Sequence, residues 1–116
     1  MDGHRANYIA RCSERLVPME AHILQFARSP WDIDNLKQLA DHFHQIAGSS
    51  AVYNLGDLQP IAEAGERLCM SMYQEQPDDI IVYWRNFREM IAQMKNILET
   101  AEKNPNAPSP SHILHA

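Results

Sequence analysis

The chain has 116 residues, which suits one domain with a single core, and 45% of them are hydrophobic and 22% charged. The formal net charge is −5, and the lysines and arginines form no basic stripe, which argues against binding to nucleic acid or to an anionic membrane. No run of 18 apolar residues occurs and no apolar segment follows the N-terminus, so we expect a cytoplasmic protein without a transmembrane helix or signal peptide. Cys12 and Cys69 both fall on apolar helix faces, which predicts buried free thiols.

Residues 8 to 27 carry apolar side chains at alternating steps of three and four, which predicts an amphipathic helix. These positions are Ile9, Cys12, Leu16, Met19, Ile23 and Phe26. Pro18 interrupts the pattern, because a proline inside a helix removes one hydrogen bond and clashes with the preceding turn. We therefore expect a kink or two nearly collinear helices, and we count an additional N-terminal helical segment in the fold.

The second helix is expected to begin near residues 29–34 and to run to about Tyr53. Ser29 suits the N-cap position with Pro30 at the first helical position, although Asp34 is an alternative cap. A tight turn over residues 54–57 follows, in which Asp57 is placed to cap the third helix. Pro60 is tolerated there because the first N–H groups of a helix have no partner within it.

The third and fourth helices are predicted from two further apolar patterns. The third contains Leu58, Ile61, Ala62, Gly65, Leu68, Cys69 and Met72, and the fourth contains Ile80, Trp84, Phe87, Ile91, Met94, Leu98 and Ala101. Residues 76–78 separate them, with Asp78 expected to cap the last helix. Because the connections are short, the chain is predicted to form an all-α, antiparallel, up-down four-helix bundle over residues 1–103, followed by a flexible proline-rich tail over 104–116.

His44 is the candidate functional residue of the second helix. Leu36, Leu39, Phe43, Ile46 and Ser50 share one side of that helix, and His44 lies between this side and the polar side, so its ring tip should reach solvent. Its nearest neighbours on the helical wheel are small: Ala40, Ala47, Gly48 and Ala51. A glycine inside a helix lowers its stability by about 1 kcal/mol relative to alanine, so the presence of Gly48 in this helix requires an explanation. We interpret it as keeping the surface open for a partner's reactive group.

Residues 44–50 read His-Gln-Ile-Ala-Gly-Ser-Ser, and a helix break follows at Asn54. This pattern resembles the signature of the histidine phosphotransfer (HPt) domain family of two-component phosphorelays, over residues 8 to 103. The resemblance implies that His44 is the phosphoacceptor, on the second helix of a four-helix bundle, and that Gly48 is the glycine of the motif. The family often has lysine where this chain has Ala47, so one cation that could steady a phosphate is missing.

The chemistry expected of His44 is simple. A neutral imidazole is nucleophilic near pH 7, since its unperturbed pKa is about 6.5. The chain has no Walker loop, no glycine-rich phosphate loop and no carboxylate set suited to Mg²⁺, so we expect neither ATP use nor a cofactor of its own. The resemblance implies that the partner is the receiver domain of a response regulator or of a hybrid histidine kinase, which brings its own Mg²⁺. We expect a monomeric phosphocarrier and no independent enzyme activity.

Three other polar residues are candidates to assist His44. Gln45 and Lys37 share the outer side of the second helix, and Lys37 lies two turns before His44, where it could meet the phosphate or an acidic group of the partner. Glu66 lies where the family often places a polar residue beside the histidine, and it could accept a hydrogen bond from one ring nitrogen. The simpler interpretation of each of the three is a plain surface residue. Ser50 is expected to hydrogen-bond to its own helix backbone.

The remaining histidines are interpreted as structural or solvated. His42 should be partly buried, and His4, His22, His112 and His115, which stand apart from other candidate ligands in the sequence, should be solvated. Asp41 and His44 have a spacing that metal sites use, but no third ligand lies nearby in sequence. Three functions therefore stay open: a phosphorelay intermediate, an HPt-like binding module that carries no phosphate, and, most remotely, a metal-dependent helical enzyme.

Overall fold

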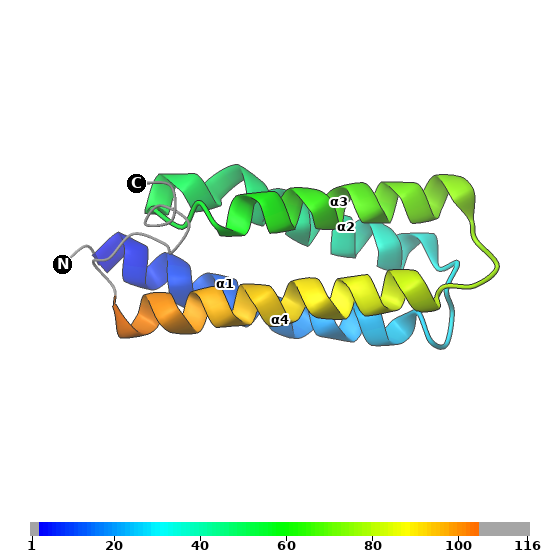
Figure 1. Ribbon diagram of the computed structural model, residues 1–116, viewed down its shortest axis with the longest axis horizontal. Coiled ribbons are helices and arrows are strands. Elements are labelled where there is room, and N and C mark those ends of the chain that lie inside the picture. Colours follow the sequence, from blue (N-terminus) through cyan, green and yellow to red (C-terminus); the bar gives the residue numbers. More distant parts are fainter. Residues whose placement is uncertain (1–2, 105–116) are drawn as a thin grey trace.

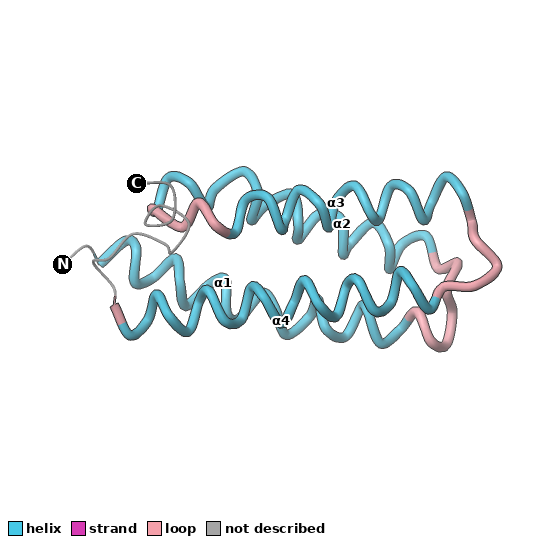
Figure 2. The backbone as a smooth tube through the Cα atoms, in the orientation of Figure 1, coloured by secondary structure: helices cyan, strands magenta, loops and turns pink. Residues whose placement is uncertain are grey.

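The computed structural model describes residues 3–104, and these form a bundle of four antiparallel helices (Figure 1 and Figure 2). α1 spans Gly3–Gln25, α2 Ile33–Ser49, α3 Leu58–Glu75 and α4 Ile81–Lys103, and a 3₁₀ helix, η1, over Ser50–Tyr53 extends α2. Helices that follow one another in the chain pack side by side, and α4 also packs against α1, which closes the bundle. The seam between α2 and α3 therefore lies opposite the seam between α1 and α4. The predicted all-α up-down bundle is confirmed, and no helix within these residues is long and apolar enough to cross a membrane.

The first helix differs from the prediction. α1 runs unbroken from Gly3 through Pro18 to Gln25, so the alternative of two separate helices is wrong. The additional N-terminal helical segment is likewise not a separate element, because the chain from Gly3 onward already belongs to α1. Pro18 removes one backbone hydrogen bond, but Leu16 and Met19 on either side of it are buried in the core, and this packing holds the helix together.

The helix ends match the predicted caps only at α3. Asp32, and neither Ser29 nor Asp34, caps α2, with its side chain accepting a hydrogen bond from the Asn35 N–H at 3.1 Å. Asp57 occupies the N-cap position of α3, as predicted, but its side chain makes no capping hydrogen bond there. At α4 it is Asp79, rather than Asp78, that accepts from a backbone N–H, that of Ile81 at 2.9 Å.

The end of α2 is tied to the start of α1. The helical segment reaches Tyr53 as predicted, with its last turn as 3₁₀, and Asn54 adopts the left-handed conformation (φ 60°, ψ 37°) that favours glycine or asparagine. The Tyr53 ring stacks on Tyr8 with the ring centroids 4.2 Å apart. Arg5 donates from Nε to the Tyr53 carbonyl oxygen at 2.8 Å. These contacts fix the C-terminal end of α2, and thereby the helix that carries His44.

The core is built around three phenylalanines. The ring of Phe87 lies 5.6 Å from that of Phe26 and 6.1 Å from that of Phe43, measured between centroids, and all three side chains are buried. Cys12 and Cys69 are free and buried, as predicted. Burial, with a smaller contribution from the nearby Glu66 carboxylate, raises the pKa of Cys69 to about 12, so its thiol stays protonated at neutral pH.

Two histidines meet where α1 packs on α2. His42 is partly buried, as predicted, and its Nδ1 lies 3.0 Å from a guanidinium nitrogen of Arg15. The prediction for His22 is wrong, since its Nδ1 lies 2.7 Å from Oδ1 of the buried Asn35 and its ring centroid is 5.6 Å from that of His42. Sequence spacing does not reveal these partners, because they come from a neighbouring helix. His112 and His115 lie outside the described residues, as does the predicted tail beyond Asn104.

The His42 contact predicts that acid weakens the fold. Burial, followed by repulsion from Arg15 and from His22, lowers the pKa of His42 below its ordinary value, and Asp41 opposes this only weakly. The unfolded chain then binds this proton more readily, so the stabilisation is complete above about pH 6.5 and is lost as the pH falls below it. We expect the free energy of unfolding in urea to drop between pH 7 and pH 5, and to drop less in His42→Gln. An equal drop in both proteins would contradict this assignment.

Candidate functional site

His44 lies near the middle of α2 and points away from the core. The residue before it, Phe43, is fully buried, as is Ile46 two positions later, whereas the His44 side chain is 65% exposed. The buried neighbours fix the helix, and the ring itself reaches solvent, as the helical wheel predicted.

The Glu66 carboxylate on α3 contacts one nitrogen of this ring. Nδ1 of His44 lies 3.0 Å from Oε2 and 3.3 Å from Oε1 of Glu66. A carboxylate can only accept, so Nδ1 carries the proton, and in the neutral ring Nε2 then keeps its lone pair. This contact matches the hydrogen bond suggested for Glu66 from the sequence. It leaves Nε2 as the nitrogen available for nucleophilic attack.

The surface one turn further along α2 is open. A Cβ atom built on Gly48 meets nothing within 4 Å, and the backbone of Gly48 does not have a positive φ. Neither packing nor backbone conformation within residues 3–104 therefore explains a glycine at this position. Ala47 is partly buried and Ala51 is exposed, so both neighbours on this side are short.

The structure brings only some of the predicted residues to His44. Gln45 is exposed on the side of α2 that faces α1, where it lines a hollow with Arg11, Ser49 and Tyr53. Lys37 lies about 10 Å from His44 along the helix axis, since it stands seven positions earlier in the helix. It borders an apolar groove of about 260 Å³ lined by Leu36, Ala40, Cys69, Met70 and Tyr73. Of the predicted residues, Glu66 contacts the imidazole, and Ala47 and Gly48 both lie one turn further along the same helix.

A family model, the Hpt domain, matches residues 5–103, which is most of the chain. The chain belongs to the Hpt domain family. Hpt domains are helical bundles that serve histidine phosphotransfer in two-component signalling, as phosphocarriers that interact with receiver domains and kinases. No curated protein and no solved structure gives a match to the chain.

Of the two serines of the Hpt motif, Ser50 differs from the prediction. Ser50 does not hydrogen-bond to its helix: its Oγ is buried and has no partner among the described residues. Ser49 does so instead, donating from Oγ to the Gln45 carbonyl oxygen at 2.7 Å. Since that hydroxyl hydrogen is committed, the Tyr8 hydroxyl is the donor in its 2.7 Å contact with Ser49 Oγ. The hydrogen bond between Tyr8 and Ser49 thereby links the motif to α1.

Sequence reasoning missed two residues of α3 on either side of Glu66. Gly65 is buried, and a Cβ built there would lie 2.4 Å from the Phe43 ring. The signal was available, because Gly65, like Gly48, is a glycine inside a helix. Arg67 lines a shallow hollow together with Glu63, Glu66 and Met70, and within residues 3–104 it makes no ion pair.

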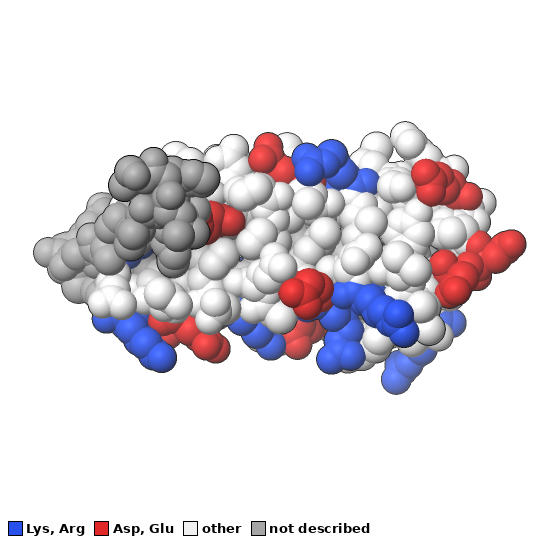
Figure 3. Space-filling view, in the orientation of Figure 1, with Lys and Arg blue, Asp and Glu red and all other residues white. Residues whose placement is uncertain are grey.

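Cations are scarce on the two helices that form this Hpt site. Lys37 and Arg67 are the only lysine or arginine of α2 and of α3. On the face drawn in Figure 3, lysine and arginine side chains gather along the lower edge, where α1 and α4 lie in Figure 1. Arg67 follows Glu66 directly and lines the hollow beside it, so it is the cation of α3 that is closest in sequence to the residue contacting His44.

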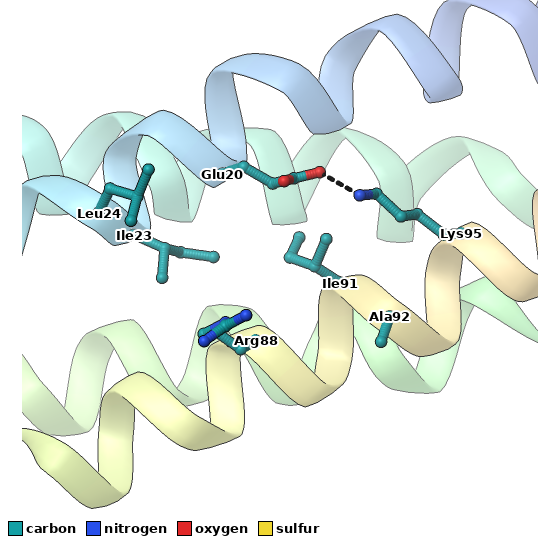
Figure 4. Close-up of a pocket in the computed structure, with 7 residues that line it drawn as sticks. All are labelled: Glu20, Ile23, Leu24, Arg88, Ile91, Ala92 and Lys95. Carbon is teal, nitrogen blue, oxygen red and sulfur yellow. Dashed lines mark ion pairs between the residues drawn. The ribbon is translucent and has the colours of Figure 1, made fainter.

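A second hollow, away from His44, lies on the opposite seam, between α1 and α4. It measures about 370 Å³ and is lined by Glu20, Ile23, Leu24, Arg88, Ile91, Ala92 and Lys95 (Figure 4). Its carboxylate is already paired, with Glu20 Oε1 2.6 Å from Lys95 Nζ. Within the described part of the chain, no three His, Cys, Asp or Glu side chains are grouped so as to hold a metal ion, at this seam or beside Asp41 and His44.

Proposed function

We propose that this Hpt domain is a phosphorelay intermediate, in which His44 accepts a phosphoryl group from the aspartyl phosphate of a receiver domain or hybrid kinase and passes it to a response regulator. One observation carries the proposal: an exposed imidazole has Nδ1 held by Glu66, and Nε2 is left free above a surface on which Gly48 presents no side chain. Family membership supports it independently.

The proposed step is a displacement at phosphorus. The Nε2 lone pair of His44 attacks the phosphorus atom, and the bond between phosphorus and the aspartate oxygen breaks with its electron pair going to the carboxylate. The ring becomes positively charged as the new bond forms, and the Glu66 carboxylate at Nδ1 stabilises that charge. The reverse step regenerates the neutral ring and an acyl phosphate, so transfer can run both ways.

The Hpt domain's own contribution is to position the nucleophile. Charge in the transition state spreads over the phosphoryl oxygens, and it has to be stabilised by cations close to them. Lys37 is two turns away and better placed to meet the partner than the phosphate, whereas Arg67 follows Glu66 directly. We expect Mg²⁺ and most of the positive charge to come from the receiver, and no cofactor to be held by this chain.

The same face offers an apolar contact beside the imidazole. Met70 is 51% exposed and Tyr73 46% exposed, and they border the groove with Ala40, one turn before His44. The nearby Leu36 and Leu39 are buried, so the apolar part of the contact comes from Met70 and Tyr73 rather than from leucines. A patch of this kind suits a transient complex of moderate affinity.

Incubation with a receiver domain carrying radiolabelled phosphate tests the proposal. We expect the label to move to the Hpt domain in a form that is labile in acid and stable in base, as for phosphohistidine, and to return when unlabelled receiver is added in excess. Binding to the receiver without transfer would instead support the alternative, a binding module of the same fold that carries no phosphate.

A further inference from the structure

Two consecutive residues of α2 contact two consecutive residues of α3. His44 meets Glu66 at the surface, and directly beneath this pair the Phe43 ring lies against Gly65. A Cβ atom at residue 65 would lie 2.4 Å, 2.5 Å and 2.6 Å from Cε1, Cδ1 and Cζ of Phe43, closer than carbon atoms approach without displacement. Gly65 has no positive φ, so its lack of a side chain serves this close packing and not an unusual backbone conformation.

The Phe43 ring has little freedom to move away from such a Cβ atom. It stacks on Phe87 with the planes 20° apart, and Phe87 in turn lies against Phe26. All three rings are at most 1% exposed, in a core where space is already filled. A methyl group at residue 65 therefore has to push α3 away from α2.

We propose that Gly65 is a positioning residue for the phosphoacceptor: by admitting the Phe43 ring, it sets α3 at the depth that brings Glu66 within hydrogen-bond distance of His44 Nδ1. Glu66 follows Gly65 in the same helix, so a displacement of α3 at residue 65 carries Glu66 with it. The contact is 3.0 Å now, and beyond about 3.5 Å it would no longer be a hydrogen bond. The catalytic relevance of this geometry depends on the proposed function, whereas the geometry itself does not.

The variant Gly65→Ala tests the proposal, and nitrogen-15 NMR of the His44 ring, assigned by comparison with His44→Gln, is the primary measurement. In the wild type we expect the neutral ring to be protonated at Nδ1. In Gly65→Ala we expect the proton to shift towards Nε2, as in Glu66→Ala, which lacks the acceptor, with helix content unchanged. Transfer from a phosphorylated receiver should fall roughly fivefold or less, since an exposed ion pair contributes at most about 1 kcal/mol.

Two further variants give the test its controls. Gly48→Ala adds the same methyl group to a helix glycine that has nothing within 4 Å, and it should leave the protonation of the His44 ring unchanged. Phe43→Val removes the δ, ε and ζ atoms that obstruct a Cβ at residue 65. The double variant Gly65→Ala/Phe43→Val should therefore regain Nδ1 protonation, and it should fold even if Gly65→Ala alone does not.

The proposal is overturned if Gly65→Ala keeps Nδ1 protonated, or if the double variant folds with the proton still on Nε2, because Phe43 would then not link the two positions. The NMR measurements of the His44 ring do not require a phosphoryl donor, so they test the proposal separately from phosphotransfer. If the ring responds as expected but the wild type accepts no label from any phosphorylated receiver, the proposed function fails while the role of Gly65 in placing Glu66 stands.

Discussion

Replacing His44 with glutamine is expected to abolish phosphorylation while leaving the bundle and its docking surface intact. Glutamine is polar, similar in length to histidine and favourable in a helix, so the exposed position should accept it without loss of helix content. Its amide nitrogen has no available lone pair and cannot attack phosphorus. We therefore expect no acid-labile label on His44→Gln after incubation with the phosphorylated receiver, together with binding to the receiver at close to wild-type affinity.

A matched control lies two residues away on the same helix. His42→Gln makes the same chemical change at a partly buried ring that contacts Arg15, and it should leave the label in place. If His44→Gln still takes up label, or if His42→Gln loses it while remaining folded, His44 is not the phosphoacceptor and the proposed function is wrong at its centre.

Replacing Gly48 with glutamine is expected to slow transfer by about a hundredfold or more and to stabilise the fold at the same time. The Cβ atom of the new side chain meets nothing within 4 Å, so the fold gains up to about 1 kcal/mol from the loss of a helix glycine. The same side chain stands one turn from His44, where the aspartyl phosphate has to approach to about 3 Å, and a misplacement of 1 Å can cost about a hundredfold in rate. Urea unfolding and transfer kinetics measure the two effects separately.

Phosphoramidate, a small phosphoryl donor, serves as the control for this variant. It needs no protein surface to reach Nε2, so Gly48→Gln should react with it at close to the wild-type rate. A smaller substitution, Gly48→Ala, should give a comparable gain in stability with a much smaller loss of transfer. Unchanged transfer from the receiver in Gly48→Gln would show that the glycine does not serve the approach of a partner.

Much of this architecture could be predicted from the sequence because it depends on local periodicity. Apolar spacing places all four helices, and the same wheel identifies His44 as an anchored residue with an exposed ring. Asn54 is recognisable as a left-handed helix end from its residue type alone. The helix caps are less determined, because acidic residues stand close together: Asp32 lies two positions before Asp34, and Asp78 directly precedes Asp79.

What the sequence could not supply is the pairing between helices. His22 contacts Asn35, and Phe43 contacts Gly65, only once α1, α2 and α3 are packed side by side. The sequence shows a glycine at residue 65 and an aromatic ring at residue 43, but nothing in their spacing of 22 residues says that one accommodates the other. The position of Glu66 beside His44 was accessible only through the family resemblance.

The fit between Phe43 and Gly65 also bears on how this protein can change over evolutionary time. While a phenylalanine ring occupies residue 43, any side chain at residue 65 contacts it. A substitution at only one of the two positions therefore disturbs the Glu66 carboxylate beside the His44 imidazole. Descendants of this sequence should therefore substitute the two positions in pairs, exchanging a large ring for a smaller group as the glycine acquires a side chain. Gly48 should instead be constrained by the docking partner alone, because a Cβ atom at this position would meet nothing within residues 3–104.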